Sequence, residues 1–111
     1  MRDDRLYLVH IAECIDRIVR YTAEGKQAFL NDTRTQDAVL RNLHVLAEST
    51  QRISQELRLR HPEVAWRDIA AFRNVIVHGY LGVDLVRLWD IVARDLPVLQ
   101  AQILAMLAER G

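Results

Sequence analysis

One stretch decides the fold class of this 111-residue chain: residues 37–57, DAVLRNLHVLAESTQRISQEL. Its apolar side chains recur every three or four residues, which is the period of one helix face. The members of this stripe are Val39, Leu43, Leu46, Ile53 and Leu57. We expect one long helix here. Thr33 to Gln36 fit a capping box at its start, and Pro62 closes it.

Three further helical segments surround this one. The first runs from about Asp4 to Ala23, with Gly25 as a stop signal. A short connection follows, and its Phe29 and Leu30 are expected to tuck against the other helices. These patterns predict helix pairs joined by short loops.

The third and fourth helices flank a glycine-containing turn. The third is short, from Val64 or Trp66 to His78, and Gly79 fits the left-handed residue that ends many helices. The fourth begins at Asp84, a good N-cap, with Val83 and Leu88 in the positions of a hydrophobic staple. Pro97 is expected to kink it, because a proline inside a helix removes one hydrogen bond.

The whole chain, residues 1–111, therefore reads as a single all-α domain, an antiparallel bundle of four main helices. Several apolar residues fall partly outside the main stripes, and a twofold dimer is the commonest way to bury such a surplus. The surplus residues are Leu40, Val45, Val86, Trp89 and Ile91.

Charge balance and cysteine content indicate the kind of partner and the cellular compartment to expect. Fifteen basic and fifteen acidic residues balance, so a nucleic-acid-coating protein is not indicated and any RNA contact must be local. Cys14 is the only cysteine, which excludes an internal disulfide and fits a reducing compartment. Charged residues interrupt the N-terminal apolar run, and no stretch approaches the roughly 20 apolar residues of a membrane span. We expect a cytoplasmic protein without a membrane partner.

Residues 73–80, RNVIVHGY, carry the candidate chemistry. At about 100° per residue, Arg73 lies at the edge of the apolar stripe and His78 lies about 140° further round the helix. Arg73 needs an anionic or hydrogen-bonding partner, either a substrate phosphate or an acid on a neighbouring helix or subunit. The residue types also fit an ordinary helix end, with His78 favoured by the helix dipole and Tyr80 packed on Val75.

The spacing Arg73-x4-His78-x-Tyr80 resembles the signature of HEPN-family ribonucleases, and more narrowly the HepT toxins that pair with a minimal nucleotidyltransferase. The resemblance covers almost the whole chain. Its further segments are Arg34-Thr35-Gln36-Asp37-Ala38-Val39, Arg41-Asn42-Leu43, His61-Pro62-Glu63 before Trp66, Gly82-Val83-Asp84-Leu85 and Asp95-Leu96-Pro97. The chain differs from a common family form at Gly79, where an acid often stands, and at Asn74, where aspartate is frequent.

The resemblance implies a toxin that is a dimeric, metal-independent endoribonuclease with no cofactor. A ribose 2′-hydroxyl would attack the adjacent phosphate and leave a 2′,3′-cyclic phosphate. His78 would move the proton, Arg73 would hold the phosphoryl oxygens, and Asn74 would orient one of the reacting groups. The angle between Arg73 and His78 predicts a site completed across the dimer axis or by uncoiling of the last helical turn.

The resemblance also implies regulation at Tyr80. A cognate nucleotidyltransferase antitoxin would transfer AMP from ATP to the Tyr80 hydroxyl, and the added phosphodiester would occupy Arg73 and repel RNA. Two other functions stay open on the residues alone. One is a catalytically inactive module that binds a nucleotidyltransferase or nucleotide; the other is a histidine phosphotransfer bundle, for which His10 and His44 stand mid-helix without a convincing surrounding motif.

The remaining candidate residues have ordinary structural explanations. His10 and Cys14, four residues apart, are too few for a zinc site, and core packing suits Cys14 better. Surface or capping roles suit His44 and His61. The tryptophans, Trp66 and Trp89, are expected to be core or interface anchors.

Overall fold

The computed structural model describes residues 2–82 and 84–110, and no strand occurs among them. The all-α prediction is therefore confirmed. The elements in chain order are α1 (Arg2–Tyr21), α2 (Lys26–Leu30), α3 (Thr33–Gln51), α4 (Gln55–Arg60), α5 (Trp66–Tyr80), α6 (Leu85–Asp90), the π-helical turn η1 (Ile91–Asp95) and α7 (Leu96–Arg110).

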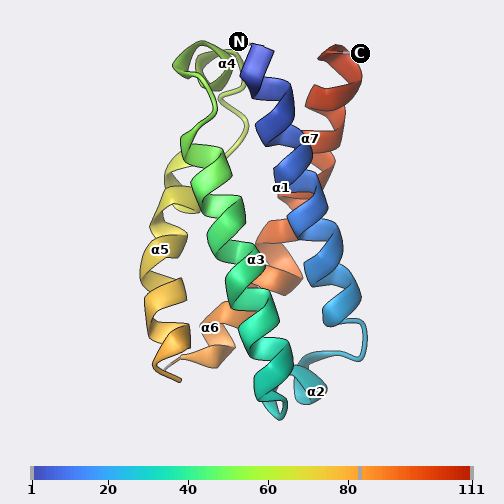
Figure 1. The fold of residues 1–111 in the computed structure, drawn as a ribbon, viewed down its shortest axis with the longest axis vertical. Helices are drawn as coiled ribbons and strands as arrows, with labels where there is room; N and C mark the ends of the chain where they lie inside the picture. Colours follow the sequence, from blue (N-terminus) through green and yellow to red (C-terminus); the bar gives the residue numbers. More distant parts are fainter. Residues whose placement is uncertain (1, 83, 111) are drawn as a thin grey trace.

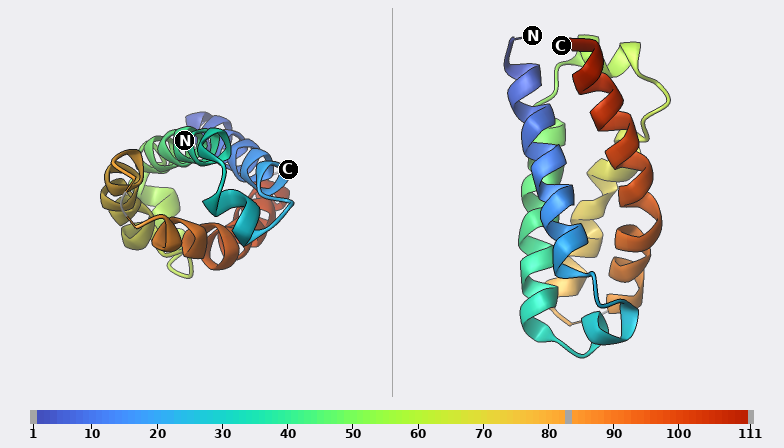
Figure 2. Two further views of the ribbon diagram at one scale, coloured as in Figure 1. Left: turned by 90° about the horizontal axis from the view of Figure 1, so that it is seen from below. Right: turned by 90° about the vertical axis from the view of Figure 1, so that its right-hand side faces the viewer.

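Four long rods, α1, α3, α5 and the continuous run α6–η1–α7, lie along the 40 Å axis of the molecule with neighbours antiparallel (Figure 1). α1 packs against α3 and α7, and α3 packs against α5. Figure 2 shows the rods arranged in a ring when viewed from below, with both chain ends at the same end of the bundle. The predicted antiparallel bundle is confirmed.

Apolar side chains from all four rods form one core. Its fully enclosed members include Leu8, Ile11, Ile15, Ile18, Phe29, Val39, Leu43, Leu46, Leu88, Ile91, Leu96 and Ile103. The predicted stripes thus point inward. Phe29, in the short helix α2, closes one end of the core and contacts the Trp89 ring at a centroid distance of 5.4 Å.

The predicted second helix is not continuous. It breaks after Gln51, and a separate helix α4 begins at Gln55. Ser54 caps α4 by accepting a hydrogen bond from Leu57 N–H, while Asp4 of α1 accepts bonds from Ser54 N–H (2.8 Å) and Ser54 Oγ (2.7 Å). Asp4 is 50 residues away from Ser54 in sequence, so no local sequence pattern predicted this contact or the break between α3 and α4.

The N-cap of α3 is one residue earlier than the capping box predicted. Asp32 accepts from the backbone N–H groups of Arg34 and Thr35 and from the Thr35 hydroxyl. These hydrogen bonds, led by the one from the Thr35 hydroxyl, lower the pKa of the Asp32 carboxyl. Gln36 instead donates its side-chain amide to the carbonyls of Phe29 and Leu30, and so ties α2 to α3.

Gly79 does not end the third helix. α5 continues to Tyr80, Leu81 is the C-cap, and Gly82 has the left-handed backbone with φ +73°. Gly79 is buried, and a Cβ built on it would stand 2.6 Å from Leu40 Cδ2 of α3. Its role is to let α3 and α5 approach closely, which a single-helix pattern does not show. Tyr80 is consequently a helical residue, and the predicted helix-end packing of Tyr80 is wrong.

The fourth helix begins as predicted. Asp84 caps it through a hydrogen bond from Arg87 N–H, whereas Val83 of the expected staple lies outside the described residues. Before Pro97 the helix makes a π-turn, in which Leu96 N–H bonds to the carbonyl of Ile91. Pro97 has no N–H to offer, so a local change of hydrogen-bond pattern near it is expected.

Most of the apolar surplus is used inside one chain. Leu40 and Ile91 are in the core and Trp89 packs against it, so only Val45 and Val86 remain largely exposed.

The expectation that no apolar stretch approaches the length of a membrane span is wrong when judged by length and composition. Residues 85–109 form a 25-residue helix in which an 18-residue window has a mean hydropathy of 1.4, long and apolar enough to cross a membrane by these two measures alone. Core helices of soluble bundles reach the same values, and this helix supplies Leu88, Leu96 and Ile103 to the core.

Candidate active site

α5 separates the predicted site residues onto two sides. Arg73, Val77 and Tyr80 follow one another at intervals of four and three residues, so they share one face of the helix. Asn74 and His78, four residues apart, share another face. All five side chains are exposed. The helix therefore presents a face with the cation and the phenol, and a separate face with the imidazole.

The face with Arg73 and Tyr80 borders a groove against α3. The groove has a volume of about 320 Å³ and is lined by His44, Ala47, Glu48, Arg73, Ile76, Val77 and Tyr80. A smaller hollow of about 110 Å³ extends it past Arg73 toward Gln51 and Ala70. We call the two together the α3–α5 groove. Its floor is apolar and its walls carry an imidazole, a carboxylate, a guanidinium and a phenol.

The close approach at Gly79 fixes how the two helices are aligned. Leu40 of α3 sits on Gly79 of α5, and the helices run antiparallel from there (Figure 1). His44, one turn further along α3 than Leu40, and Glu48, two turns further, therefore line the same groove as Arg73, Val77 and Tyr80. The same residue that permits close packing thus determines which side chains share the groove.

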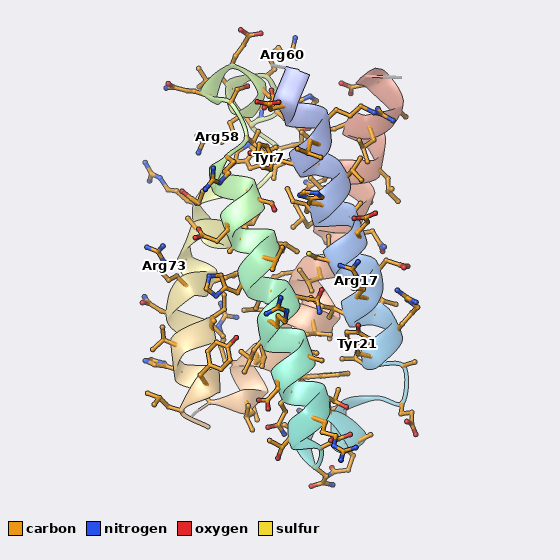
Figure 3. All side chains as sticks on the ribbon, viewed as in Figure 1. Tyr7, Arg17, Tyr21, Arg58, Arg60 and Arg73 are labelled. Carbon is orange, nitrogen blue, oxygen red and sulfur yellow. The ribbon has the colours of Figure 1, made fainter. Side chains whose placement is uncertain are left out.

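Arg73 is free to receive an anion. In the part of the chain that the structure describes, it forms no hydrogen bond or ion pair. Figure 3 shows its side chain at the outer edge of α5. Glu48 borders the same groove and is the neighbouring acid that sequence reasoning allowed as a partner, but no ion pair joins it to Arg73 among the described residues.

His78 does not reach the groove. It is absent from the lining residues, and α5 is helical through His78 to Tyr80, so the last turn is not uncoiled. Within one chain the structure brings Arg73 together with Tyr80 and leaves His78 and Asn74 on a different face of α5. One of the two ways expected to unite Arg73 with His78, an unwound turn, is not seen; assembly across a dimer axis remains a prediction.

A second cleft, about 390 Å³, lies on the opposite side of α5, between α5 and the run η1–α7. Its apolar part includes Phe72 and Leu99, and its polar rim includes Asp68, Arg87 and Asp95. None of the predicted site residues lines it. Its size alone does not connect it with the predicted chemistry.

The other candidates take structural positions. Cys14 is buried, and this burial raises the pKa of its thiol. His10 contacts the Tyr7 ring edge-on at 6.2 Å. Within residues 2–82 and 84–110, no cluster of three or more His, Cys, Asp or Glu side chains is placed to hold a metal ion. Trp66 donates its indole N–H to the His61 carbonyl, in keeping with the anchoring role expected for it.

His61 is more connected than a surface role would require. It is buried, and its two ring nitrogens lie 2.8 Å from Glu63 Oε2 and 3.4 Å from Glu109 Oε1. The hydrogen bond with His61 lowers the pKa of the Glu63 carboxyl. These contacts tie the loop between α4 and α5 to the end of α7. Glu109 was invisible to sequence reasoning, because 48 positions separate it from His61.

Sequence reasoning also missed that His44 borders the groove. The available signal was weak: His44 and Glu48, four residues apart, share a face of α3. Only the antiparallel alignment with α5 shows that this face opposes Arg73 and Tyr80.

Comparison with known proteins identifies the family. The model of the family described as "HepT-like: Ribonuclease HepT-like" matches residues 11–106. This chain belongs to that HepT-like ribonuclease family. The family resemblance noted in the sequence is confirmed, and the matched range includes every residue assigned to the candidate site.

Curated relatives agree with this family. A protein of Thermococcus cleftensis named "Probable ribonuclease HepT" is 38% identical over 102 residues, covering 91% of this chain and 93% of its own. A "Putative RNase" of Methanocaldococcus jannaschii is 29% identical over 92% of this chain and 94% of its own. A third, "Gamma-glutamylcyclotransferase and putative RNase" of the same organism, is 32% identical over 97% of this chain, which spans 49% of that longer protein. No solved structure gives a significant match. The HepT-like family and its relatives support a ribonuclease-type enzyme.

Proposed function

We propose that this HepT-like protein is the toxin of a toxin–antitoxin pair, a metal-independent endoribonuclease that acts as a homodimer on cellular RNA in the cytoplasm. The observation that carries the proposal is the exposed Arg73, which has no ion-pair or hydrogen-bond partner among the described residues and borders a groove that Tyr80 also lines, on a member of the HepT-like family. An exposed guanidinium without an internal partner is suited to binding phosphate through two parallel hydrogen bonds.

The residue types match the chemistry of RNA cleavage by the ribose 2′-hydroxyl. His78 takes the proton from the 2′-hydroxyl, since imidazole is the side chain that exchanges protons near neutral pH. Arg73 stabilises the charge that develops on the phosphoryl oxygens. Asn74, which shares a helix face with His78, orients the imidazole. The products are a 2′,3′-cyclic phosphate and a 5′-hydroxyl, and the fixed charge of Arg73 takes the place that a metal ion would have.

A twofold dimer brings Arg73 of one chain to His78 of the other. Val77 and Tyr80, which line the groove, are large exposed apolar side chains, and so are Val45 and Leu81, the sequence neighbours of His44 and Tyr80. Exposed apolar side chains close to one another favour an interface. The dimer would also resolve the separation of Arg73 and His78 on the two sides of α5.

A cognate nucleotidyltransferase is the proposed antitoxin, and Tyr80 is its target. Tyr80 is 55% exposed and borders the groove beside Arg73. AMP on its hydroxyl would place a phosphodiester where the RNA backbone binds, and Arg73 would pair with that group instead of substrate.

The deciding experiment incubates purified protein with labelled RNA in the presence of EDTA. We expect cleavage with 2′,3′-cyclic phosphate ends and loss of cleavage in His78→Ala. No cleavage by the wild type, or undiminished cleavage by His78→Ala, would reject the nuclease. A stable complex with the neighbouring nucleotidyltransferase without any nuclease activity would instead favour a catalytically inactive binding module.

A further inference from the structure

We propose that His44 is the second proton-transfer residue of the ribonuclease site, the one that protonates the leaving 5′-oxygen. The inference rests on the proposed nuclease function and deepens it. The motif Arg73-x4-His78-x-Tyr80 contains a single imidazole, whereas the reaction moves two protons.

The cleavage reaction needs a second proton-transfer group, because one proton is removed and another is added. The 2′-oxygen forms a bond to phosphorus and loses its proton to a base, and the bond from phosphorus to the 5′-oxygen breaks. The 5′-oxygen leaves as an alkoxide unless an acid gives it a proton as the bond breaks. With His78 taking the first proton, a different group must supply the second, because attack and departure take place on opposite sides of phosphorus.

The α3–α5 groove provides an imidazole for that step. His44 lines it together with Arg73, the proposed phosphate-binding residue. His44 is exposed, and it forms no hydrogen bond or ion pair in the described part of the chain, so no structural contact explains its side chain. His10 and His61, by contrast, are engaged with Tyr7 and with Glu63 and Glu109.

The antiparallel packing of α3 on α5 determines the position of His44 in the groove. Gly79 against Leu40 fixes the register of α3 on α5, and His44, one helical turn beyond Leu40, lines the groove between the two helices. A phosphate held by Arg73 would then have His44 of the same chain on the groove side. His78 of the second chain in the proposed dimer would complete the site.

A leaving group that needs no proton tests the assignment. The cleavage position is first mapped on an oligoribonucleotide, and the same oligonucleotide is made with a bridging sulfur in place of the 5′-oxygen at that position. Since a thiolate leaves without protonation, the acid becomes dispensable. We expect His44→Ala and His44→Gln to cleave the oxygen substrate at least about 100-fold more slowly. Most of that loss should be recovered on the sulfur substrate, whereas His78→Ala should stay slow on both.

The control is His10→Ala, which removes a histidine from α1 and should cleave both substrates like the wild type. Thermal unfolding of the His44 variants should match the wild type, because the side chain is exposed. Equal losses on the two substrates, or no loss on either, would overturn the role of His44 while leaving the nuclease intact. Failure of the wild type to cleave either substrate would overturn both proposals.

Discussion

At the scale of single residues, the sequence and the structure say different things about the stretch Arg73–Tyr80. Sequence spacing predicted Arg73, His78 and Tyr80 as site residues, because family motifs depend on residue type and interval. It was not sufficient to say which of them meet. Tyr80 proved to be a helical residue beside Arg73, since the helix continues past Gly79.

Tyr80→Phe separates packing from modification. The phenyl ring keeps the apolar contacts of a residue that is 55% exposed, so we expect the free energy of unfolding to change by less than about 0.5 kcal/mol. RNA cleavage should persist, because the hydroxyl is not part of the proposed reaction. Mass spectrometry after incubation with the nucleotidyltransferase and ATP should show an AMP-sized adduct on the wild type and none on Tyr80→Phe. An adduct on both proteins would place the modification elsewhere.

At the scale of elements, the contact between α3 and α5 depends on one missing side chain. Gly79 is a poor helix former, yet it lies inside α5 because Leu40 occupies the space that a Cβ would need. Sequence reasoning assigned this glycine to a helix end, which is its commonest use. The close contact of the Leu40 side chain with the Gly79 backbone outweighed the preference of glycine for helix ends.

Gly79→Ala tests this contact through a double-mutant cycle. Alanine gains up to about 1 kcal/mol of helix propensity, but crowding a packed core costs about 1–3 kcal/mol, so we expect a net loss of about 1 kcal/mol. In a Leu40→Ala background the crowding disappears, and Gly79→Ala should then be neutral or stabilising. Chemical denaturation of the four proteins measures the coupling. Additive effects would show that Leu40 and Gly79 do not compete for space.

At the scale of the whole molecule, long-range polar contacts hold the end of the bundle at which both chain termini lie (Figure 1). Asp4 of α1 binds Ser54, and His61 joins Glu63 in the loop before α5 to Glu109 of α7. None of these pairs except His61 and Glu63 is close in sequence.

The Glu63 carboxyl should make stability pH-dependent. Its pKa is lowered in the folded protein by the hydrogen bond with His61, so the folded state prefers the ionised form more than the unfolded chain does. The resulting stabilisation is present above the ordinary pKa of glutamate and is lost as the pH falls through the lowered value. Thermal unfolding of Glu63→Gln should therefore occur below the wild-type temperature at neutral pH, and the difference should vanish in acid. A difference that persists in acid would assign the effect to shape and not to charge.

Mixing two inactive variants tests the dimeric site. If Arg73 and His78 of different chains meet, a mixed dimer of Arg73→Ala and His78→Ala has one site with both residues intact. Random exchange should then restore about a quarter of the wild-type activity, because half of the dimers regain one site of two. RNA cleavage before and after exchange provides the measurement. No recovery, with mixed dimers verified by native mass spectrometry, would mean that the two residues act within one chain.

The sequence by itself determined the helical class, most of the core and the residue types of the candidate site, because these depend on spacing along one helix. Only the tertiary structure decided where α3 ends, why Gly79 is required and which side chains share the groove. Each of these depends on a partner from another helix: Asp4 for Ser54, Leu40 for Gly79, and His44 for the Arg73 face. The proposed chemistry thus rests on the Arg73–Tyr80 stretch, and the antiparallel packing of α3 on α5 supplies its surroundings.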